Sequence, residues 1–343
     1  MFRGCYTALI TPMLRNCKVD FEGLKTLVGF QSSQGANGIL AAGTTGETPT
    51  LTWDEHNLVI ERVHEYNAGK SITIAGTGSN CTRESMESTK HAYDLGIKSV
   101  LLVDPYYNGP SSLEIRLEYI APIAERFPDV QMIPYIIPGR TGTQLLPQDL
   151  AVLHSQCSNV RAVKEATGDL ENMKLTRKLC GENFDILSGD DDKTFSMMTD
   201  NMIKASGVIS VTSNIAPAAV QRMSTLILEG RSHEAEKLSD ALRPLFQIVT
   251  IKTATETRFG EVSVKARNPL PYKSLMNILG MPSGPPREPL GKMTKKGLHI
   301  LLDAARKVYE NNPWILEPIE DSFDVDLSQR LYEEKFWKGL AYD

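Results

Sequence analysis

The sequence lacks the residue spacings by which proteins usually bind metal ions or nucleotide phosphates. Its five cysteines are scattered without a CxxC pair, and its six histidines include no HExxH motif. No GxxxxGK stretch occurs, and the glycine-containing segment 75–78 is too short for a dinucleotide fingerprint. We therefore expect no metal site and no bound nucleotide. The odd number of dispersed cysteines predicts reduced thiols in a cytoplasmic protein.

A long apolar run and an excess of positive charge are also missing. No segment approaches the ~18 uninterrupted apolar residues of a membrane span. Pro12 interrupts the first apolar run, which has no basic region before it and predicts a strand rather than a signal peptide. The formal net charge of −5 gives no electrostatic reason to bind nucleic acid or anionic lipid. We expect neither a nucleic-acid partner nor a membrane partner.

The sequence does contain short apolar runs that alternate with longer amphipathic segments. The short runs are rich in Val, Ile and Leu with little polar alternation, as in parallel strands covered on both faces. They predict eight strands, at residues 6–10, 38–42, 71–75, 99–103, 131–137, 160–164, 184–187 and 207–211. A predicted helix follows each strand, at residues 21–34, 52–67, 83–95, 112–127, 147–156, 170–180, 193–205 and 216–228.

Eight such units predict an α/β fold, a (β/α)8 TIM barrel with additional C-terminal helices, in which residues 1–230 form the barrel. A doubly wound open sheet is the alternative, although open sheets seldom reach eight parallel strands without an antiparallel edge. Residues 231–310 are predicted as a C-terminal helical region, with helices at 237–253 and 294–310 and connecting turns at 268–271 and 281–286. Residues 311–343 predict a C-terminal extension that packs or pairs.

Active sites of such barrels lie at the C-terminal ends of the strands, and two of these ends suit a carboxylate ligand. After the second strand, Gly43-Thr44-Thr45-Gly46-Glu47 predicts a tight turn whose backbone N–H groups can face an anion. After the fifth, Tyr135 can pass a proton and Arg140 can hold a carboxylate with its two-pronged guanidinium. The alternatives are an ordinary turn, a packed tyrosine and a solvated arginine.

The sixth predicted strand ends at Lys164, which places its amine in the mouth of the barrel. Burial there disfavours the ammonium form, and a neutral amine is a nucleophile that forms an imine with a ketone. The alternative is a lysine paired with Glu165 at the rim. Tyr106 and Tyr107 are interpreted as packing residues, and the three aspartates at 190–192 as helix-capping groups rather than a metal site.

Taken together, these segments resemble the dihydrodipicolinate synthase and N-acetylneuraminate lyase family. The resemblance extends from the first residues to about residue 310. The stretches that carry it are Thr11-Pro12-Met13, Gly43-Thr44-Thr45-Gly46-Glu47, Ala75-Gly76-Thr77-Gly78, Pro105-Tyr106-Tyr107-Asn108, Pro138-Gly139-Arg140-Thr141-Gly142, Val163-Lys164-Glu165-Ala166-Thr167-Gly168 and Ser188-Gly189-Asp190-Asp191.

The resemblance implies a Schiff-base lyase that condenses pyruvate with L-aspartate 4-semialdehyde to 4-hydroxy-tetrahydrodipicolinate, on the diaminopimelate route to lysine. Arg140 is typical of the synthases, whereas sialic-acid lyases and sugar-acid aldolases generally lack an arginine there. A pyruvate-dependent aldolase acting on another 2-oxo acid and a noncatalytic pyruvate-binding sensor are the alternatives. The resemblance implies no cofactor, because the lysine imine itself serves as the electron sink.

The same resemblance implies a role for each site residue. These roles are imine formation for Lys164, a proton relay for Tyr135, Thr45 and Tyr107, pyruvate carboxylate binding for Thr44 and Thr45, semialdehyde carboxylate binding for Arg140, and a backbone lining of the pyruvate site for Gly189 and Ile209. Tyr107 would reach across from a neighbouring subunit, so that a homotetramer or homodimer is expected.

The chain departs from the family pattern in three places. Ile136 and Gly139 replace an Asn and a Ser that are frequent near the second substrate. The family's lysine feedback site is partly matched, by His56, Asn80, Glu84 and Tyr106, but Pro49 and Trp53 replace smaller or hydrogen-bonding residues. We therefore expect weak or absent inhibition by lysine. The segment 253–267 and the tail after 311 exceed the usual family length, so that no particular oligomer follows from the family.

Overall fold

Eight parallel strands close into a barrel at the centre of the protein. The structure is a computed structural model that describes residues 2–342. The strands pair in sequence order, and β8 returns to β1, which places Ile209 beside Tyr6. They are β1 (Gly4–Ala8), β2 (Gly38–Ala41), β3 (Ile72–Gly76), β4 (Ser99–Val103), β5 (Gln131–Ile136), β6 (Ala162–Glu165), β7 (Asp185–Ser188) and β8 (Gly207–Ser210). This closure confirms the predicted TIM barrel and excludes the open sheet.

The seam between β1 and β8 depends on two glycines. A Cβ atom at Gly207 would lie 2.1 Å from the carbonyl oxygen of Gly4, and Gly4 itself has a φ of +83°. Only a residue without a side chain permits so close an approach of the two backbones. The first and last strands therefore pair, and the ring is complete.

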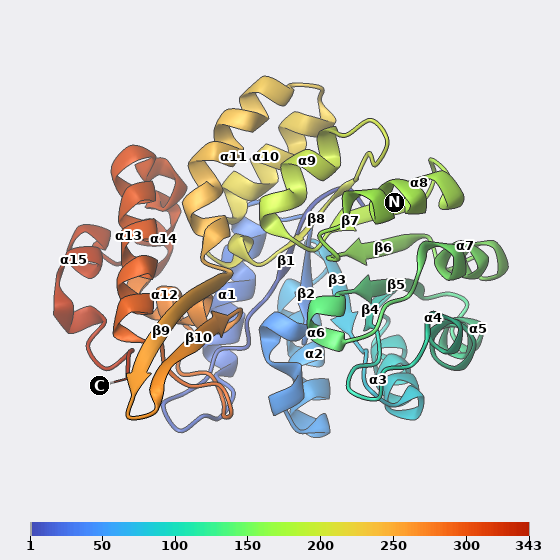
Figure 1. Cartoon of the computed structure of the whole chain (residues 1–343), viewed down its shortest axis with the longest axis horizontal. Helices are drawn as coiled ribbons and strands as arrows, with labels where there is room; N and C mark the ends of the chain where they lie inside the picture. The colour runs from blue at the N-terminus through green and yellow to red at the C-terminus, as the bar shows by residue number, and fades with distance from the viewer. Residues whose placement is uncertain (1, 343) are drawn as a thin grey trace.

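Helices surround the barrel on its outer side (Figure 1). They are α1 (Phe21–Ser33), α2 (Trp53–Asn67), α3 (Thr82–Asp94), α4 (Ser112–Glu114), α5 (Ala121–Arg126), α6 (Pro138–Thr141), α7 (Pro147–Gln156), α8 (Leu170–Cys180), α9 (Thr194–Thr199) and α10 (Pro217–Leu228). A π-helical segment, Ile115–Ile120, joins α4 to α5, so the helix predicted at 112–127 is continuous. The helix predicted at 193–205 is too long. It ends at Asp200, whose side chain accepts a hydrogen bond from the amide of Met202 and turns the chain.

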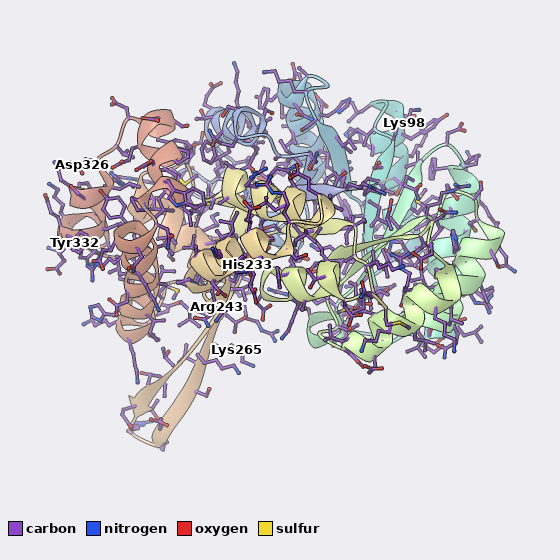
Figure 2. All side chains as sticks on the ribbon, turned by 90° about the horizontal axis from the view of Figure 1, so that it is seen from above. Lys98, His233, Arg243, Lys265, Asp326 and Tyr332 are labelled. Atoms are coloured by element: carbon purple, nitrogen blue, oxygen red, sulfur yellow. The ribbon has the colours of Figure 1, made fainter. Side chains whose placement is uncertain are left out.

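The region after the barrel is not purely helical, and the prediction of helices alone for residues 231–310 is wrong at its centre. Between α11 (Ser232–Gln247) and α12 (Leu270–Leu279), β9 (Thr250–Thr257) and β10 (Gly260–Arg267) form an antiparallel hairpin. Alternating β-branched residues favour these strands, which extend away from the body of the molecule (Figure 2). The turn predicted at 268–271 instead enters α12, because Pro271 is compatible with the first turn of a helix.

The C-terminal extension packs against the preceding helices, as the sequence predicts. It follows α13 (Lys295–Asn311) and contains α14 (Glu317–Phe323) and α15 (Leu327–Tyr332). Phe323 packs edge-to-face on Phe30 of α1, and the Arg330 guanidinium donates to the carbonyl oxygens of Ile278 and Asn277 at the end of α12. Among residues 2–342, no helix is both long enough and apolar enough to cross a bilayer.

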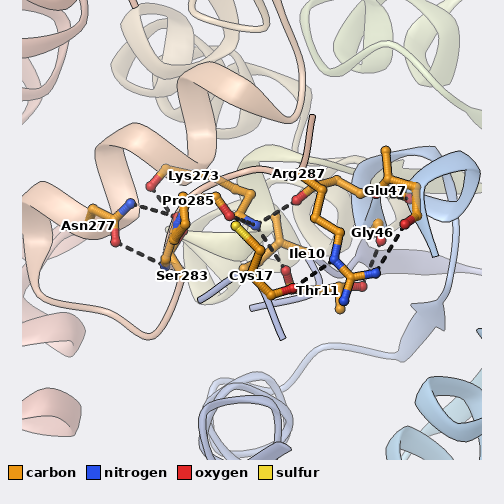
Figure 3. A network of polar contacts seen from close by, with 12 residues as sticks. Ile10, Thr11, Cys17, Gly46, Glu47, Lys273, Asn277, Ser283, Pro285 and Arg287 are labelled. Atoms are coloured by element: carbon orange, nitrogen blue, oxygen red, sulfur yellow. Dashed lines mark hydrogen bonds and ion pairs between the residues drawn. The ribbon is translucent and has the colours of Figure 1, made fainter. Parts of the chain in front are cut away.

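A buried ion pair joins the barrel to the C-terminal region (Figure 3). The Lys273 ammonium on α12 lies 2.5 Å from the Glu47 carboxylate, and both side chains are 0% exposed. Lys273 also donates to the carbonyl oxygens of Thr11 and Pro285, while the second carboxylate oxygen of Glu47 accepts from the amide of Arg287. All three hydrogens of the ammonium group and both oxygens of the carboxylate are thereby engaged, which offsets the cost of removing two charges from water.

Lys273→Met should therefore destabilise the protein by about 3–5 kcal/mol, because it leaves the Glu47 carboxylate buried without a counter-charge. Urea unfolding followed by circular dichroism measures this loss. The matched control is Glu47→Gln/Lys273→Met, which removes both charges and should recover part of the stability. Equal stability of the single variant and the parent protein would contradict the structural role of the pair.

Candidate active site

Lys164 ends β6 and is 4% exposed, with its ammonium group 4.2 Å from the centre of the Tyr135 ring. The two residues are direct partners in the register of β5 and β6. Glu165, the next residue, points to the other side of the strand. Its carboxylate accepts from the amide of Thr167 and from the Asn172 side chain. The alternative of a Lys164–Glu165 ion pair is therefore wrong, and the lysine faces the barrel mouth as expected.

Burial lowers the pKa of Lys164 to about 8, against the opposing effect of Asp191 and Asp190. Burial shifts the pKa values of the neighbouring carboxyl groups in the opposite direction, upward. Burial and the neighbouring aspartates raise the pKa of Asp190 to about 6, and burial raises that of Glu165 to about 7. A poorly solvated site thus favours neutral forms on both sides, and about a tenth of the amine is uncharged at pH 7.

A cavity of about 170 Å³ lies over the Lys164 amine. We call it the lysine cavity. It is lined by Thr45, Tyr135, Ile137, Gly139, Arg140, Lys164, Gly189, Asp190, Val211, Val249, Thr250, Arg267 and Asn268. A second cavity of about 200 Å³ adjoins it and shares Tyr135, Ile137 and Arg140, with Thr44 in its wall. The structure therefore brings together Lys164, Tyr135, Thr45, Thr44, Arg140 and Gly189, six of the residues that the sequence singled out.

Two guanidinium groups stand at the lysine cavity. Arg140 follows β5 on the short helix α6 and donates 2.9 Å to the carbonyl oxygen of Asn268. Arg267, at the end of β10, donates to the carbonyl oxygen of Gly139. Both contacts join the β5 loop to the base of the hairpin. The arrangement suits an anionic ligand, because a guanidinium binds a carboxylate through two parallel N–H groups.

The Thr44–Thr45 turn has the geometry of an anion site. Residues 44–46 form one 3₁₀ turn, in which the amides of Gly46 and Glu47 donate to the carbonyl oxygens of Gly43 and Thr44. The first amides of such a turn have no acceptor within it and remain available to a ligand. Glu47, which ends this turn, is the residue held by Lys273.

Asn268 is a site residue that the sequence did not reveal. Its side-chain N–H donates 3.0 Å to the hydroxyl of Thr45, and it is buried with its amide oxygen unpartnered within residues 2–342. The segment 268–271 was interpreted as a connector, because 223 residues separate Asn268 from Thr45. Only the folded chain brings the two together.

Asp191 does not cap a helix, contrary to the interpretation of the aspartates at 190–192. Its buried carboxylate accepts from the amides of Val211 and Thr212 and from the Thr212 hydroxyl, at the end of β8. Burial raises its pKa. The carboxylate thus joins the segment after β7 to the end of β8 and holds Val211, which lines the lysine cavity. Among residues 2–342, no cluster of His, Cys, Asp and Glu is suited to hold a metal ion.

Gly189 packs directly on the lysine. Its amide donates to the carbonyl oxygen of Glu165, and a Cβ atom at this position would lie 3.2 Å from the Lys164 Cε atom. The shortest contact of such a Cβ atom would be 2.8 Å to the Cβ of Ala166, so a glycine here avoids crowding against the end of β6 and leaves the lysine side chain uncrowded. Ile209 is fully buried in β8, but the residue that lines the lysine cavity from that side is Val211.

Tyr107 lies apart from the other proposed relay residues. It sits on the loop after β4 with a φ of +80°, and 92% of its surface is exposed. A bulky residue in this left-handed conformation carries backbone strain, which is common at functional positions. Within one chain Tyr107 lines neither cavity.

A third cavity of about 180 Å³ collects all four residues of the partly matched feedback site. His56, Asn80, Glu84 and Tyr106 line it together with Pro49 and Trp53. The Trp53 ring packs edge-to-face on His56, whose Nε2 lies 2.9 Å from the carbonyl oxygen of Gly76. Tyr106 also lines the cavity beside Thr44, and the two spaces share Thr48, Pro49, Gly78 and Tyr106 in their walls.

Comparisons with known proteins identify the family of the chain. Residues 1–307 match the model of the Dihydrodipicolinate synthetase family. The chain belongs to this family. It is 39% identical over 308 residues to a 4-hydroxy-tetrahydrodipicolinate synthase of Sulfurihydrogenibium, covering 90% of this chain and 98% of the relative. A synthase of Methanococcus maripaludis is 37% identical over 293 residues, 85% of this chain and 94% of the relative.

The solved structures support the same assignment. The crystal structure of dihydrodipicolinate synthase from Aquifex aeolicus is 36% identical and superposes with a TM-score of 0.82, over 92% of this chain and all of that chain. The protein is thus an enzyme of this family, a lyase like its curated relatives.

Proposed function

We propose that this enzyme condenses pyruvate with L-aspartate 4-semialdehyde to give 4-hydroxy-tetrahydrodipicolinate, through an imine on Lys164. The observation that carries the proposal is the buried Lys164 amine, with a pKa lowered to about 8, beside Tyr135 in a cavity of about 170 Å³. The named synthases that the chain resembles support the choice of substrates.

The first step joins the neutral Lys164 amine to the ketone carbon of pyruvate. The nitrogen–carbon bond forms, the carbonyl oxygen takes up protons and leaves as water, and a C=N bond remains. Burial raises the pKa of the Tyr135 phenol, which keeps it protonated and able to donate to the departing oxygen. The Thr44–Thr45 turn would hold the pyruvate carboxylate, and the backbone of Gly189 would line the same site, with Val211 where the family resemblance places Ile209.

The imine then acts as an electron sink, so no external cofactor is required. Loss of a proton from the neighbouring methyl group gives an enamine, whose carbon attacks the aldehyde of the second substrate. The Thr45 hydroxyl, fixed by Asn268, would connect Tyr135 to Tyr107 as a proton relay. Because Tyr107 is exposed in the single chain, the relay requires Tyr107 of another subunit, and we propose a homodimer or homotetramer.

Arg140 favours this reaction over a sugar-acid aldolase. It lines the lysine cavity, is anchored by the carbonyl oxygen of Asn268, and would bind the semialdehyde carboxylate. A noncatalytic pyruvate sensor would not need the paired Lys164 and Tyr135 or the buried Thr45 hydroxyl. The five cysteines are free thiols, in keeping with a cytoplasmic location.

Borohydride reduction in the presence of pyruvate should give a stable adduct on Lys164. Because the attacking species is the neutral amine and its pKa is about 8, the initial trapping rate should rise about tenfold per pH unit below pH 8 and level off above it. Peptide mass mapping locates the adduct, and Lys164→Ala is the control that should lack it. Turnover without modification of this peptide would disprove the imine mechanism.

Arg140→Ala should lower kcat/KM for aspartate semialdehyde by about 10- to 100-fold, because a charge-assisted contact with its carboxylate is lost. Borohydride trapping of pyruvate should change little. Arg140→Lys, which keeps the charge but not the forked geometry, should recover part of the activity. If the variant instead loses pyruvate trapping, or if sugar-acid substrates turn over better than the semialdehyde, the choice of second substrate is wrong.

L-Lysine should inhibit the enzyme weakly or not at all. Trp53 and Pro49 occupy the wall of the cavity that His56, Asn80, Glu84 and Tyr106 line, where they reduce both space and hydrogen-bonding capacity. Initial rates at increasing L-lysine, with D-lysine as the control, measure the effect. Strong inhibition by L-lysine alone would contradict the prediction.

A further inference from the structure

The β9–β10 hairpin is an arm with two unpaired edges. Its base is held by the buried Ile251 and Ala266 and by a contact between the hydroxyls of Thr253 and Thr294. Beyond the base it projects from the body (Figure 2), with Val262 50% and Phe259 86% exposed. An isolated two-stranded ribbon is marginally stable in water, and its unpaired edges are templates for another strand.

The charges of the arm are segregated along its length. In the observed register Glu256 lies opposite Glu261 near the tip, and Lys252 lies opposite Lys265 near the base. Like charges directly opposite one another destabilise a sheet. No ion pair formed within residues 2–342 includes any of these four residues. We call the Glu256–Glu261 pair the acidic end of the arm and the Lys252–Lys265 pair its basic end. Arg258, in the turn beyond the glutamates, stacks on Phe259 and within the described chain forms no ion pair with either glutamate.

We propose that β10 pairs antiparallel with β10 of a second copy of this chain, about a two-fold axis at Ser263. Reversal of the strand about this residue places Glu261 opposite Lys265 and Val262 opposite Val264, each twice. The acidic end of one arm then lies on the basic end of the other, and the four valines form an apolar strip. The two hairpins become one four-stranded sheet, an isologous contact of the kind that closes a dimer.

The β10 edge fits such pairing better than the β9 edge. An axis at Ala254 would also match Lys252 with Glu256, but it would pair Thr253 with Thr255, which offer less apolar surface than the valines. The Thr253 hydroxyl is in addition engaged by Thr294 at the start of α13. The edge of β10 from Gly260 to Lys265 consists of exposed residues apart from the half-buried Val264.

The same register connects the arm to the active site. Beyond the paired residues, it brings the turn of the second copy, where Phe259 precedes β10, toward Arg267, which lines the lysine cavity and donates to the carbonyl oxygen of Gly139. In one chain Phe259 has only the Arg258 guanidinium stacked on its ring. Pairing of the arms would therefore cover the exposed Phe259 of each copy and add a wall beside the mouth of the lysine cavity.

Disulfide cross-linking of the full-length protein tests the register. Ser263→Cys places its two copies directly across the axis, within the Cα separation that a disulfide spans, and oxidation should give a covalent dimer. Ala254→Cys, at the centre of the other edge, is the matched control and should stay unlinked, as should the parent protein with its five native cysteines. Efficient linking at 254 rather than 263, or linking at neither position, overturns the proposal, because the free edge of β10 is then not paired with β10 of a second copy.

Charge reversal in the Ser263→Cys background tests the pairing energy. Glu261→Lys or Lys265→Glu alone should slow cross-linking at least about tenfold at low salt, because two attractive pairs become repulsive. The double reversal should restore the rate. Each single change also replaces a like-charge pair within the hairpin by an opposite-charge pair, which stabilises the hairpin. Unfolding of the arm therefore does not explain slower cross-linking. The rate at which the introduced cysteine in each variant reacts with a maleimide gives its thiol reactivity, and each cross-linking rate is divided by it. A single charge reversal that leaves this corrected cross-linking rate unchanged would refute the proposal.

Discussion

The buried Glu47–Lys273 ion pair is the constraint that ties the chemistry of this protein to its fold. Glu47 ends the turn that contains Thr44 and Thr45, and Lys273 belongs to a helix that follows the completed barrel. Two charges without water are tolerable only when each satisfies the other in a fixed geometry. The pair therefore orients the proposed carboxylate-binding turn and at the same time holds α12 against the barrel. Asn268, two residues before α12, donates to Thr45.

A second electrostatic constraint acts at the lysine cavity: burial moves the Lys164 amine and the nearby carboxyl groups toward their neutral forms. The pKa of Lys164 falls while those of Asp190, Asp191 and Glu165 rise. An amine surrounded by fully ionised carboxylates would remain an ammonium ion and could not attack a ketone. The strand ends supply these groups, and the barrel supplies the desolvation that makes them reactive.

The base of the β9–β10 hairpin contributes to the site from outside the barrel. Thr250, Arg267 and Asn268 reach the lysine cavity from a segment beyond the barrel strands. Family membership supports the proposed imine chemistry, and in that proposal this segment would shape the space for the second substrate. A contact made by the arm would consequently act on the side of the site where Arg140 stands.

The sequence by itself determined the barrel, its helices and the position of Lys164 at the end of β6, because apolar runs and turn residues are local signals. It did not reveal the hairpin, since its alternating threonines and charges lack an apolar run. Only the tertiary structure decided that Asp191 binds the end of β8, that Asn268 donates to Thr45 and that Lys273 pairs with Glu47. Each of these contacts joins residues that become neighbours when the ring of strands closes and the later helices fold back on it, and no local pattern encodes that proximity.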